Sequence, residues 1–547
     1  MTAPAEPTDQ PGDLVLGPVL RRVEGDRATV WVETGHPATV EVKAGPKAHG
    51  AGRTFAVHGH HYALVVVEGL PPASTTPYEV LVDGAVVWPL PADPYPAPSI
   101  RTRAPGEPTR LVFGSCRKAT PYSADRFPPD ALDAYAVRLA TTSGQPTPDL
   151  IMRLGDQVYA DETPEKIRGW LKRRRAHRRR DAPTAQVVDF HEYTKLYLDS
   201  WTDPEIRWLL SCVPSAMIFD DHEIIDDWNS SASWRASISR ESWWRKRIQA
   251  GLASYWVYQH LGNLAPSALA EDPIYAAVAS TDDATQVLDD FGTRADDDRG
   301  SYRWSFALDI DRTRIVVLDN RAGRQLTPGH RSMLPESEWQ WLSSTVRGEY
   351  DHLVVGSSLP WLLPPAIHHL EAISERLADS PRRIVAGLAE RTRLALDLEH
   401  WASFGHSFDS LSVLLGQVGA GSAPPATISV LSGDVHHSYV AKALYDTDVV
   451  SPLHQLTSSP VHNEAPKAIR PAMRFGWNPS AARGLRAFAR TIGLRGPVVR
   501  WRKLMGPYFG NAVGTLVHNG RQARVTIEGT EPDKKLTVVG QLRLDRS

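Results

Sequence analysis

The first hundred residues alternate apolar and polar positions in short runs. The runs at 28–34 (ATVWVET), 38–44 (ATVEVKA), 62–70 (YALVVVEGL) and 78–87 (YEVLVDGAVV) are separated by glycine, proline and aspartate at intervals typical of hairpins. Residues 13–104 are therefore predicted to form a small antiparallel β-sandwich domain. The preceding residues 1–12 are polar and contain several prolines, and we expect them to be a disordered tail.

From residue 105 onward, continuous apolar runs replace the alternation. Such runs, separated by longer helical stretches such as 241–261 and 335–346, indicate strands that are covered on both faces. We therefore predict a layered α/β domain over residues 105–547, which ends in a hairpin formed by 523–529 and 535–544. The six apolar runs are 110–116 (RLVFGSC), 149–156 (DLIMRLGD), 215–221 (SAMIFDD), 314–320 (RIVVLDN), 352–358 (HLVVGSS) and 427–434 (TISVLSGD).

The overall composition limits the partners and the compartment. The 547 residues are 42% hydrophobic and 23% charged with a formal net charge of -2, so there is no chain-wide attraction to nucleic acid or to an anionic membrane. Two cysteines, Cys116 and Cys212, are too few for a disulfide framework, which fits a reducing compartment. No apolar run approaches the ~20 residues that cross a bilayer. We expect a cytoplasmic protein without a membrane partner.

Two stretches depart from this neutral balance. Residues 165–181 and 483–503 are strongly basic. Each stretch is either a solvated helix face or a surface that attracts a polyanionic substrate, and the sequence leaves both interpretations open.

Polar residues of a few chemical types directly follow the predicted strands. The carboxyl ends of strands in α/β sheets form the crevice where ligands bind, so these residues are expected to converge. One Gly-Asp or Asp-His after a strand is more often a turn or a cap, but five strands ending this way favour a site. The strand-end residues are Cys116; Asp156, Tyr159 and Asp161; Asp220, Asp221, His222 and Glu223; Asp319 and Arg321; and Asp434, His436 and His437.

The clustered carboxylates predict a metal centre, because they would repel one another unless a cation neutralised them. Other hydrolytic motifs are missing from the sequence. A Cys-x5-Arg phosphatase loop starting at Cys116 would need arginine where Tyr122 stands. Neither a Gly-x-Ser-x-Gly elbow nor a Gly-rich phosphate loop occurs. These observations favour metal-assisted hydrolysis.

Five segments together resemble the PhoD-like alkaline phosphatase family, within the calcineurin-like metallophosphatase superfamily. In chain order they are "FGSC", "GDQVYAD", "DDHE", "LDNR" and "SGDVHHS", and the resemblance covers roughly residues 109–460. It implies an α/β fold, a layered metallophosphatase β-sandwich flanked by helices. It also accounts for the preceding small all-β domain, which members of this family carry.

The resemblance also implies roles for individual residues. A di- or multinuclear centre, Fe³⁺ with Ca²⁺ by family precedent or other divalent cations, would serve hydrolysis of phosphomonoesters or phosphodiesters. His222 is expected to face the leaving group and Arg321 to contact a phosphoryl oxygen. Glu223, Asp319 and His437 are expected to support the site, with Glu223 or a neighbouring aspartate holding the His222 ring. The implied metal ligands are Cys116, Asp156, Tyr159, Asp221, Asp434 and His436.

The sequence departs from the family pattern in three places. After Arg321, "AGR" stands where an aromatic residue is common; the twin-arginine signal of extracellular members is missing; and the stretch 165–181 has no counterpart. Two alternatives stay open: a degenerate member that binds a phosphorylated ligand without turnover, and a nuclease or nucleic-acid phosphatase. The expected partner is a phosphorylated small molecule or a phosphodiester. Nucleic acid is less favoured, and the oligomeric state is left open.

Overall fold

The computed structural model describes residues 14–91, 94–118, 128–175, 182–463 and 470–546. The predicted tail over residues 1–12 and the end of the basic stretch 165–181 lie outside the described residues, as does Tyr122.

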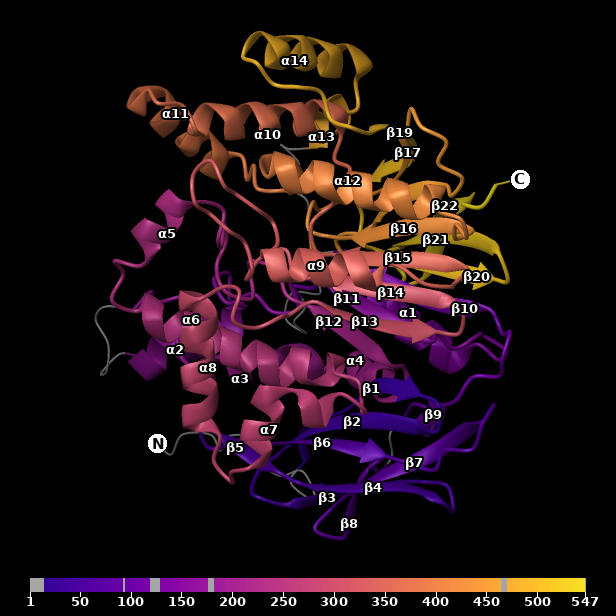
Figure 1. The fold of residues 1–547 in the computed structure, drawn as a ribbon. Coiled ribbons are helices and arrows are strands. Elements are labelled where there is room, and N and C mark those ends of the chain that lie inside the picture. The colour runs from indigo at the N-terminus through magenta and orange to yellow at the C-terminus, as the bar shows by residue number, and fades with distance from the viewer. Residues whose placement is uncertain (1–13, 92–93, 119–127, 176–181, 464–469, 547) are drawn as a thin grey trace.

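The N-terminal strands form two antiparallel sheets that pack face to face (Figure 1). Val30 and Val65 from one sheet and Val40 and Val80 from the other are fully buried in the core between them. The expected all-β sandwich is therefore present. One sheet has the order β1 (Leu14–Glu24), β2 (Arg27–Thr34), β6 (His60–Val67) and β5 (Phe55–Val57). The other has the order β4 (Ala48–Arg53), β3 (Thr39–Ala44), β7 (Thr75–Val82) and β8 (Ala85–Trp88), and β9 (Ser99–Arg101) pairs with β7.

This sandwich is joined to the larger domain by buried side chains of β1 and β2. Trp31 packs against Tyr258 with ring centroids 5.2 Å apart. The completely buried Arg21 donates hydrogen bonds to the carbonyl oxygens of Ser215 (3.1 Å) and Gln259 (2.7 Å). Burial lowers the pKa of Arg21 to about 9. Arg21 thus connects the two domains through neutral carbonyl groups, with no carboxylate among these partners.

The larger domain contains two sheets, and the six predicted strands are confirmed as β10, β11, β12, β14, β15 and β16. In the first sheet β10, β11 and β12 are parallel; in the second, β14, β15, β16 and β18 are parallel. The first sheet has the order β12 (Ser215–Ile218), β11 (Leu150–Leu154), β10 (Thr109–Gly114), β20 (Ala512–Asn519), β21 (Gln522–Thr530), β22 (Leu536–Arg543). The second has the order β13 (Phe306–Ile310), β14 (Thr313–Leu318), β15 (His352–Ser357), β16 (Thr427–Ser432), β18 (Leu453–Thr457), β17 (Ser438–Leu444), β19 (Arg500–Tyr508).

Helices cover the outer faces of both sheets, which explains the continuous apolar runs (Figure 1). Phe113 and Val354 belong to the core between the sheets. Their chain neighbours Val112 and Val355 belong to the two outer cores, which contain the helices. The first sheet is covered by α1 (Ala131–Thr141), α3 (Phe190–Trp201), α4 (Pro204–Cys212) and α6 (Trp244–Tyr255). The second is covered by α9 (Glu336–Thr345) and α12 (Gly405–Ala420).

The C-terminal segment completes the first sheet. β21 and β22 pair antiparallel as the predicted hairpin, and β20, which the sequence pattern did not single out, pairs antiparallel with β10 and anchors the hairpin there. Among the described residues, no helix combines the length and the apolar character needed to cross a membrane. The remaining α-helices are α2 (Glu165–Arg175), α5 (Ala232–Ile238), α7 (Pro273–Ala279), α8 (Thr285–Asp297), α10 (Pro365–Ala378), α11 (Arg383–Ala395), α13 (Arg470–Gly476) and α14 (Pro479–Thr491).

The first basic stretch contributes to packing. Its described part is α2, whose Arg175 is buried and donates to the carboxylate of Glu192, while Arg174 contacts Asp189 at 3.2 Å. These two arginines hold α2 against the start of α3.

Candidate metal centre

The predicted site residues meet at one edge of the double sheet. The register pairs Leu154 with Ile218 in the first sheet and Leu318 with Ser357 in the second, so the parallel strands end level with one another. The loops that follow these ends converge as expected for α/β sheets. Cys116 follows β10, Asp156 follows β11, Asp221 follows β12 and Asp434 follows β16.

Four of the predicted ligands lie in the left-handed region of backbone conformation. The φ angles are 58° at Cys116, 54° at Asp156, 64° at Asp434 and 47° at His436. This conformation costs an L-residue roughly 1–3 kcal/mol and persists where the surrounding structure enforces it, commonly at functional sites. The strand ends are therefore bent sharply at the residues that the sequence marks for chemistry.

Two glycines allow these bends to pack closely. A Cβ atom at Gly155, where φ is 100°, would lie 2.7 Å from Cβ of Asp220. A Cβ atom at Gly433 would lie 1.9 Å from Oγ of Ser115. Each glycine precedes a predicted ligand aspartate, so the Gly-Asp pairs in the sequence reflect close approach of the loops.

Two overlapping groups of side chains are arranged so that each could hold a cation. Ligand atoms of Asp156, Asp221 and His222 lie within 4.8 Å of one another, and so do those of Asp220, Asp221 and Asp434. Asp221 belongs to both groups. Among the described residues, the buried oxygens Asp156 Oδ1 and Asp220 Oδ2 have no hydrogen-bond partner. Such oxygens are costly unless a cation or proton satisfies them, so the residues fit a pair of adjacent metal ions.

Burial makes these carboxylates hard to ionise without added positive charge. It is the largest cause of the raised pKa values of Asp156, Asp220 and Asp221, and repulsion from neighbouring carboxylates adds to it. Bound cations would reverse this effect by favouring the charged form. The oxygen ligands suit hard cations such as Ca²⁺ or Fe³⁺.

Cys116 and Tyr159 lie beside Asp156. The Cys116 Sγ atom is 3.2 Å from Asp156 Oδ2, and the Tyr159 hydroxyl is 3.5 Å from the same oxygen. Both side chains are buried, and burial raises the pKa of the Cys116 thiol and of the Tyr159 phenol. A bound cation would be needed to hold them as thiolate and phenolate. Ser459 and Asn463 support them by donating to Cys116 Sγ (3.3 Å) and Tyr159 Oη (3.1 Å).

The His222 ring is held by Asp161. His222 Nδ1 lies 3.0 and 3.1 Å from the two Asp161 oxygens, and its ring lies tilted against that of Tyr159 with centroids 4.6 Å apart. Although burial raises the pKa of Asp161, the positive charge and hydrogen bond of His222 outweigh it and lower that pKa to about 2. Because Nδ1 is bonded to Asp161, Nε2 is the nitrogen left for chemistry. The aspartate expected near this ring is therefore Asp161.

Glu223 joins the loops after β11 and β12. Its carboxylate accepts backbone N–H groups of Asp156 (3.0 Å), Gln157 (2.5 Å) and Asp220 (2.9 Å), together with the Gln259 amide (3.2 Å). It is 1% exposed and does not contact the His222 ring through these bonds. Glu223 thus holds the backbone at Asp156 and Asp220, which belong to the two candidate cation-binding groups.

Arg321 lies beneath the carboxylates. Its side chain is completely buried and donates to Asp220 and Glu399, and its third nitrogen lies 3.4 Å from Asp221 Oδ1. Although burial lowers the pKa of this guanidinium, the carboxylates outweigh burial and raise it. The sequence predicts contact with a phosphoryl oxygen, but the enclosing carboxylates occupy the guanidinium and separate it from solvent.

The remaining predicted residues lie around this core. Asp319 accepts the backbone N–H groups of Arg321, Ala322 and Gly323, which caps the turn after β14. His437 is buried, with Nδ1 2.6 Å from the Val435 carbonyl oxygen. His436 follows Asp434 by two residues and belongs to neither carboxylate group. Asp319 and His437 therefore contact the backbone of the loops that follow β14 and β16.

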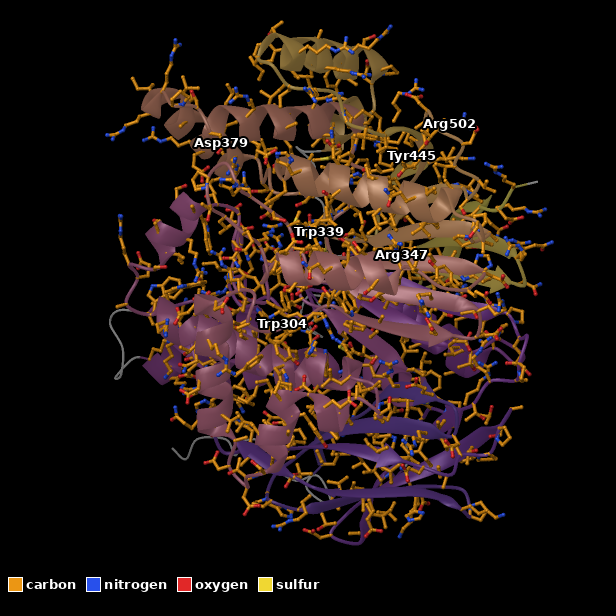
Figure 2. The ribbon with its side chains drawn as sticks, viewed as in Figure 1. Trp304, Trp339, Arg347, Asp379, Tyr445 and Arg502 are labelled. Atoms are coloured by element: carbon orange, nitrogen blue, oxygen red, sulfur yellow. The ribbon has the colours of Figure 1, made fainter. Side chains whose placement is uncertain are left out.

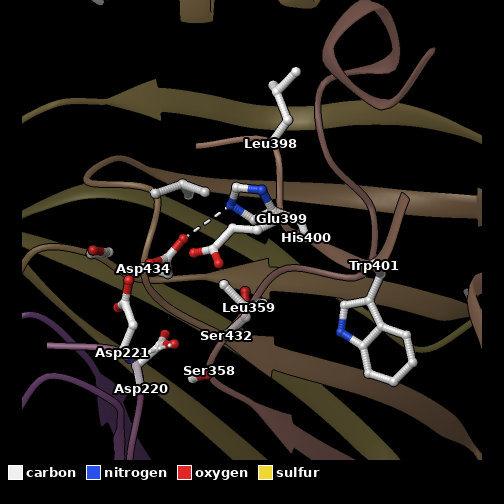
Figure 3. A network of polar contacts seen from close by, with 12 residues as sticks. Asp220, Asp221, Ser358, Leu359, Leu398, Glu399, His400, Trp401, Ser432 and Asp434 are labelled. Atoms are coloured by element: carbon white, nitrogen blue, oxygen red, sulfur yellow. Dashed lines mark hydrogen bonds and ion pairs between the residues drawn. The ribbon is translucent and has the colours of Figure 1, made fainter. Parts of the chain in front are cut away.

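Sequence reasoning missed a histidine that holds Asp434. His400 Nε2 lies 3.0 Å from Asp434 Oδ2 and its Nδ1 lies 2.7 Å from Glu371 Oε1, as Figure 3 shows for the Asp434 contact. Although burial raises the pKa of Asp434, the hydrogen bond and charge of His400 outweigh it and lower that pKa to about 2. Glu399 lies beside His400 in Figure 3. It is a partner of Arg321. Both residues stand in "DLEHW" (397–401), a loop that follows a helix and carries no strand-end signal.

Residues 119–482 match the PhoD-like phosphatase family, and residues 11–100 match a domain of unknown function, DUF7800. The first match covers more than half of the chain. The chain belongs to the PhoD-like phosphatase family. No curated protein sequence matches it significantly.

The solved structures that are similar to this chain include the following two. A structure described as PhoD superposes with a TM-score of 0.60 at 13% sequence identity, covering 99% of this chain and 92% of that one. A purple acid phosphatase from yellow lupin (Lupinus luteus) seeds gives a TM-score of 0.48 at 12% identity, covering 97% of this chain and 74% of that one. At 13% identity, the match to the PhoD structure shows that the two chains share a fold.

Proposed function

We propose that this PhoD-like protein is a metal-dependent phosphoester hydrolase that acts on phosphomonoesters or phosphodiesters. Family membership supports a phosphatase. The observation that carries the proposal is the two candidate cation-binding groups that share Asp221. Within them, Asp156 and Asp220 each have a buried oxygen without a hydrogen-bond partner among the described residues. A degenerate binding protein would have no need to retain these costly oxygens.

The donor types favour iron and calcium as the ions. Carboxylates suit Ca²⁺, whereas the thiol of Cys116 and the phenol of Tyr159, both against Asp156, suit iron. When bound, two adjacent cations supply Lewis acidity toward the phosphoryl oxygens and lower the pKa of water. The chain's own residues set the geometry in which that chemistry takes place.

His222 is proposed to give a proton to the leaving-group oxygen. Asp161 fixes the ring through Nδ1, which leaves Nε2 as the nitrogen that can meet a substrate. The histidine is partly exposed, in contrast to the buried carboxylates beside it, so a substrate can reach it. This arrangement supplies an oriented acid next to the metal groups.

Arg321 is assigned a positioning role, and Lys118 the contact with the phosphoryl group. Arg321 is enclosed by Asp220 and Glu399 and acts through them. Lys118 lies with Nζ 5.2 Å from the centre of the Tyr159 ring, and its side chain is 23% exposed. Its present partner Glu162 is an exposed carboxylate that a phosphoryl oxygen can replace.

Elemental analysis of wild type beside Asp156→Ala tests the proposal. We expect metal in the purified wild type and almost none in the variant. Phosphoester hydrolysis should fall by at least about 10³-fold, since the ions supply several kcal/mol of transition-state stabilisation.

Asp319→Asn is the matched control for this loss. Asp319 also ends a buried strand, but its oxygens accept three backbone N–H groups and it lies in neither carboxylate group. Its metal content should stay close to that of wild type. A wild type that stays metal-free after incubation with iron and calcium would overturn the proposal.

A further inference from the structure

One end of the molecule combines a dense positive charge with exposed apolar side chains. Residues 470–503 contain nine arginine and lysine residues and no aspartate or glutamate. The net charge of -2, on which the expectation of no membrane partner rests, conceals this local excess because carboxylates elsewhere balance it. The nine are Arg470, Arg474, Arg483, Arg486, Arg490, Arg495, Arg500, Arg502 and Lys503.

Most of these cations lie on the surface. Arg474, Arg483, Arg490, Arg495 and the strand residues Arg500, Arg502 and Lys503 are exposed, and Figure 2 shows Arg502 at the edge of the molecule. Arg483 donates to neutral groups, the Pro479 carbonyl and the Ser480 hydroxyl, so that its charge is not cancelled by these contacts. The segment therefore presents a positive surface to its surroundings.

Large apolar side chains are exposed on the same helices as the cations and on α11. Phe475 is 62% exposed and Phe488 is 50% exposed, and these are the two phenylalanines with large exposure among the described residues. On α11, Ile384 is 87% exposed and Leu388 is 66% exposed; they lie four residues apart and so share one side of that helix. Exposed apolar groups of this size next to a positive surface commonly mark an interaction site.

The two sets of residues belong to one layer of helices. α10 packs against both α11 and α14, and α13 packs against α14. In Figure 1 these four helices lie together at the end of the molecule opposite the strands β3, β4 and β8. We call residues 470–503 with Ile384 and Leu388 the distal face.

We propose that the distal face docks on an anionic lipid bilayer surface. Arginine and lysine attract acidic headgroups, while phenylalanine, isoleucine and leucine enter the boundary between headgroups and acyl chains. Nucleic acid would attract the same cations, but it offers no apolar phase for Ile384 and Leu388. The observed mixture therefore favours lipid.

The distal face is continuous with the surroundings of the metal centre. The guanidinium groups of Arg470 and Arg474 lie 5.8 and 5.3 Å from the ring centre of Phe509. That ring in turn lies 5.6 Å from the ring of His437, next to the predicted ligand His436. These contacts connect one edge of the distal face to the surroundings of the candidate metal centre.

Vesicle flotation of the full-length protein tests the proposal. The probes are vesicles of phosphatidylcholine alone and of phosphatidylcholine mixed with phosphatidylserine. Wild type should float with the mixed vesicles, remain unbound with the neutral ones, and dissociate as salt is added. Joint substitution Arg483→Glu and Arg490→Glu should weaken partitioning about 30-fold or more. Phe475→Ser with Phe488→Ser should weaken it roughly tenfold.

Controls separate docking from folding and from simple charge. Arg27→Glu with Arg53→Glu removes exposed cations from the N-terminal sandwich and should leave partitioning unchanged. Circular dichroism and phosphoester hydrolysis in solution should be the same for all these variants. The proposal is overturned if wild type does not bind the mixed vesicles. It is equally overturned if the phenylalanine variant binds like wild type while both wild type and that variant bind an oligonucleotide, because nucleic acid would then be the ligand.

Discussion

The two ends of the double sheet differ in how their buried polar groups are satisfied. At the carboxyl ends, Asp156 and Asp220 each keep a buried oxygen without a hydrogen-bond partner among the described residues. At the amino ends, His352 of β15 stacks on His518 of β20 with ring centroids 3.9 Å apart. His352 bonds to the Thr427 hydroxyl and the Gly520 carbonyl oxygen, each at 2.8 Å.

The difference lies in how charge is managed. Burial lowers the pKa of both His352 and His518, so the amino end links the two sheets through neutral rings. The carboxyl end instead gathers carboxylates that Arg321 balances only in part. Neutral contacts favour stability, whereas an excess of buried negative charge is useful only if a cation is to bind. We therefore call the amino ends of these strands the structural end and the carboxyl ends the chemical end.

The largest effect is expected at the chemical end, from His222→Ala. Loss of a proton donor should lower kcat by about 10²–10⁴-fold while metal per chain is unchanged. Asp161→Asn, which leaves the ring without its carboxylate partner, should cost about 10–100-fold. Steady-state kinetics with elemental analysis of the same samples measures both. If the His222→Ala variant lost its metal, His222 would be a metal ligand instead. Its place beside Asp156 and Asp221 in one candidate cation-binding group allows that role.

Arg321→Met tests whether the chemical end depends on an internal counter-charge. The change leaves Asp220 buried without its arginine partner and leaves Glu399 paired with Arg324 alone. The metal-free protein should therefore lose about 3–5 kcal/mol of unfolding free energy. Arg312→Met is the matched control: Arg312 pairs with Asp351 at the surface, and its loss should cost less than about 1 kcal/mol. Urea denaturation in the presence of chelator gives both values. Equal stability of the two variants would contradict the contrast between the two ends.

The sequence predicted those parts of the molecule that leave a local pattern. Strands covered on both faces produce continuous apolar runs. The polar site residues directly follow these runs in the chain. Asp156, Asp221 and Asp434 could therefore be named, and the structure brings them to one edge because the strands are parallel.

Contacts made by distant segments left no such pattern. Glu399 reaches Arg321 from 78 residues away, and His400 reaches Asp434 from a loop between helices. The prediction that Arg321 contacts a phosphoryl oxygen rests on its place after a strand. The sequence does not show that the buried side chain pairs with Asp220 and Glu399. His352 and His518 are likewise joined only because the two sheets pack together.

The smallest effect is expected at the structural end, as a pH dependence of stability. Because burial lowers the pKa of His352 and His518 in the folded protein, the unfolded chain binds more protons below about pH 6.5. Their contribution is therefore complete above that pH and is lost as the pH falls, by up to about 1.4 kcal/mol per pH unit for each histidine. His518→Phe keeps a stacked ring but removes one titration. Urea denaturation from about pH 7.5 to about pH 5 should show a shallower decline for this variant, with metal content and kcat at neutral pH unchanged. Identical declines would mean that the histidine pair does not set the acid sensitivity of the structural end.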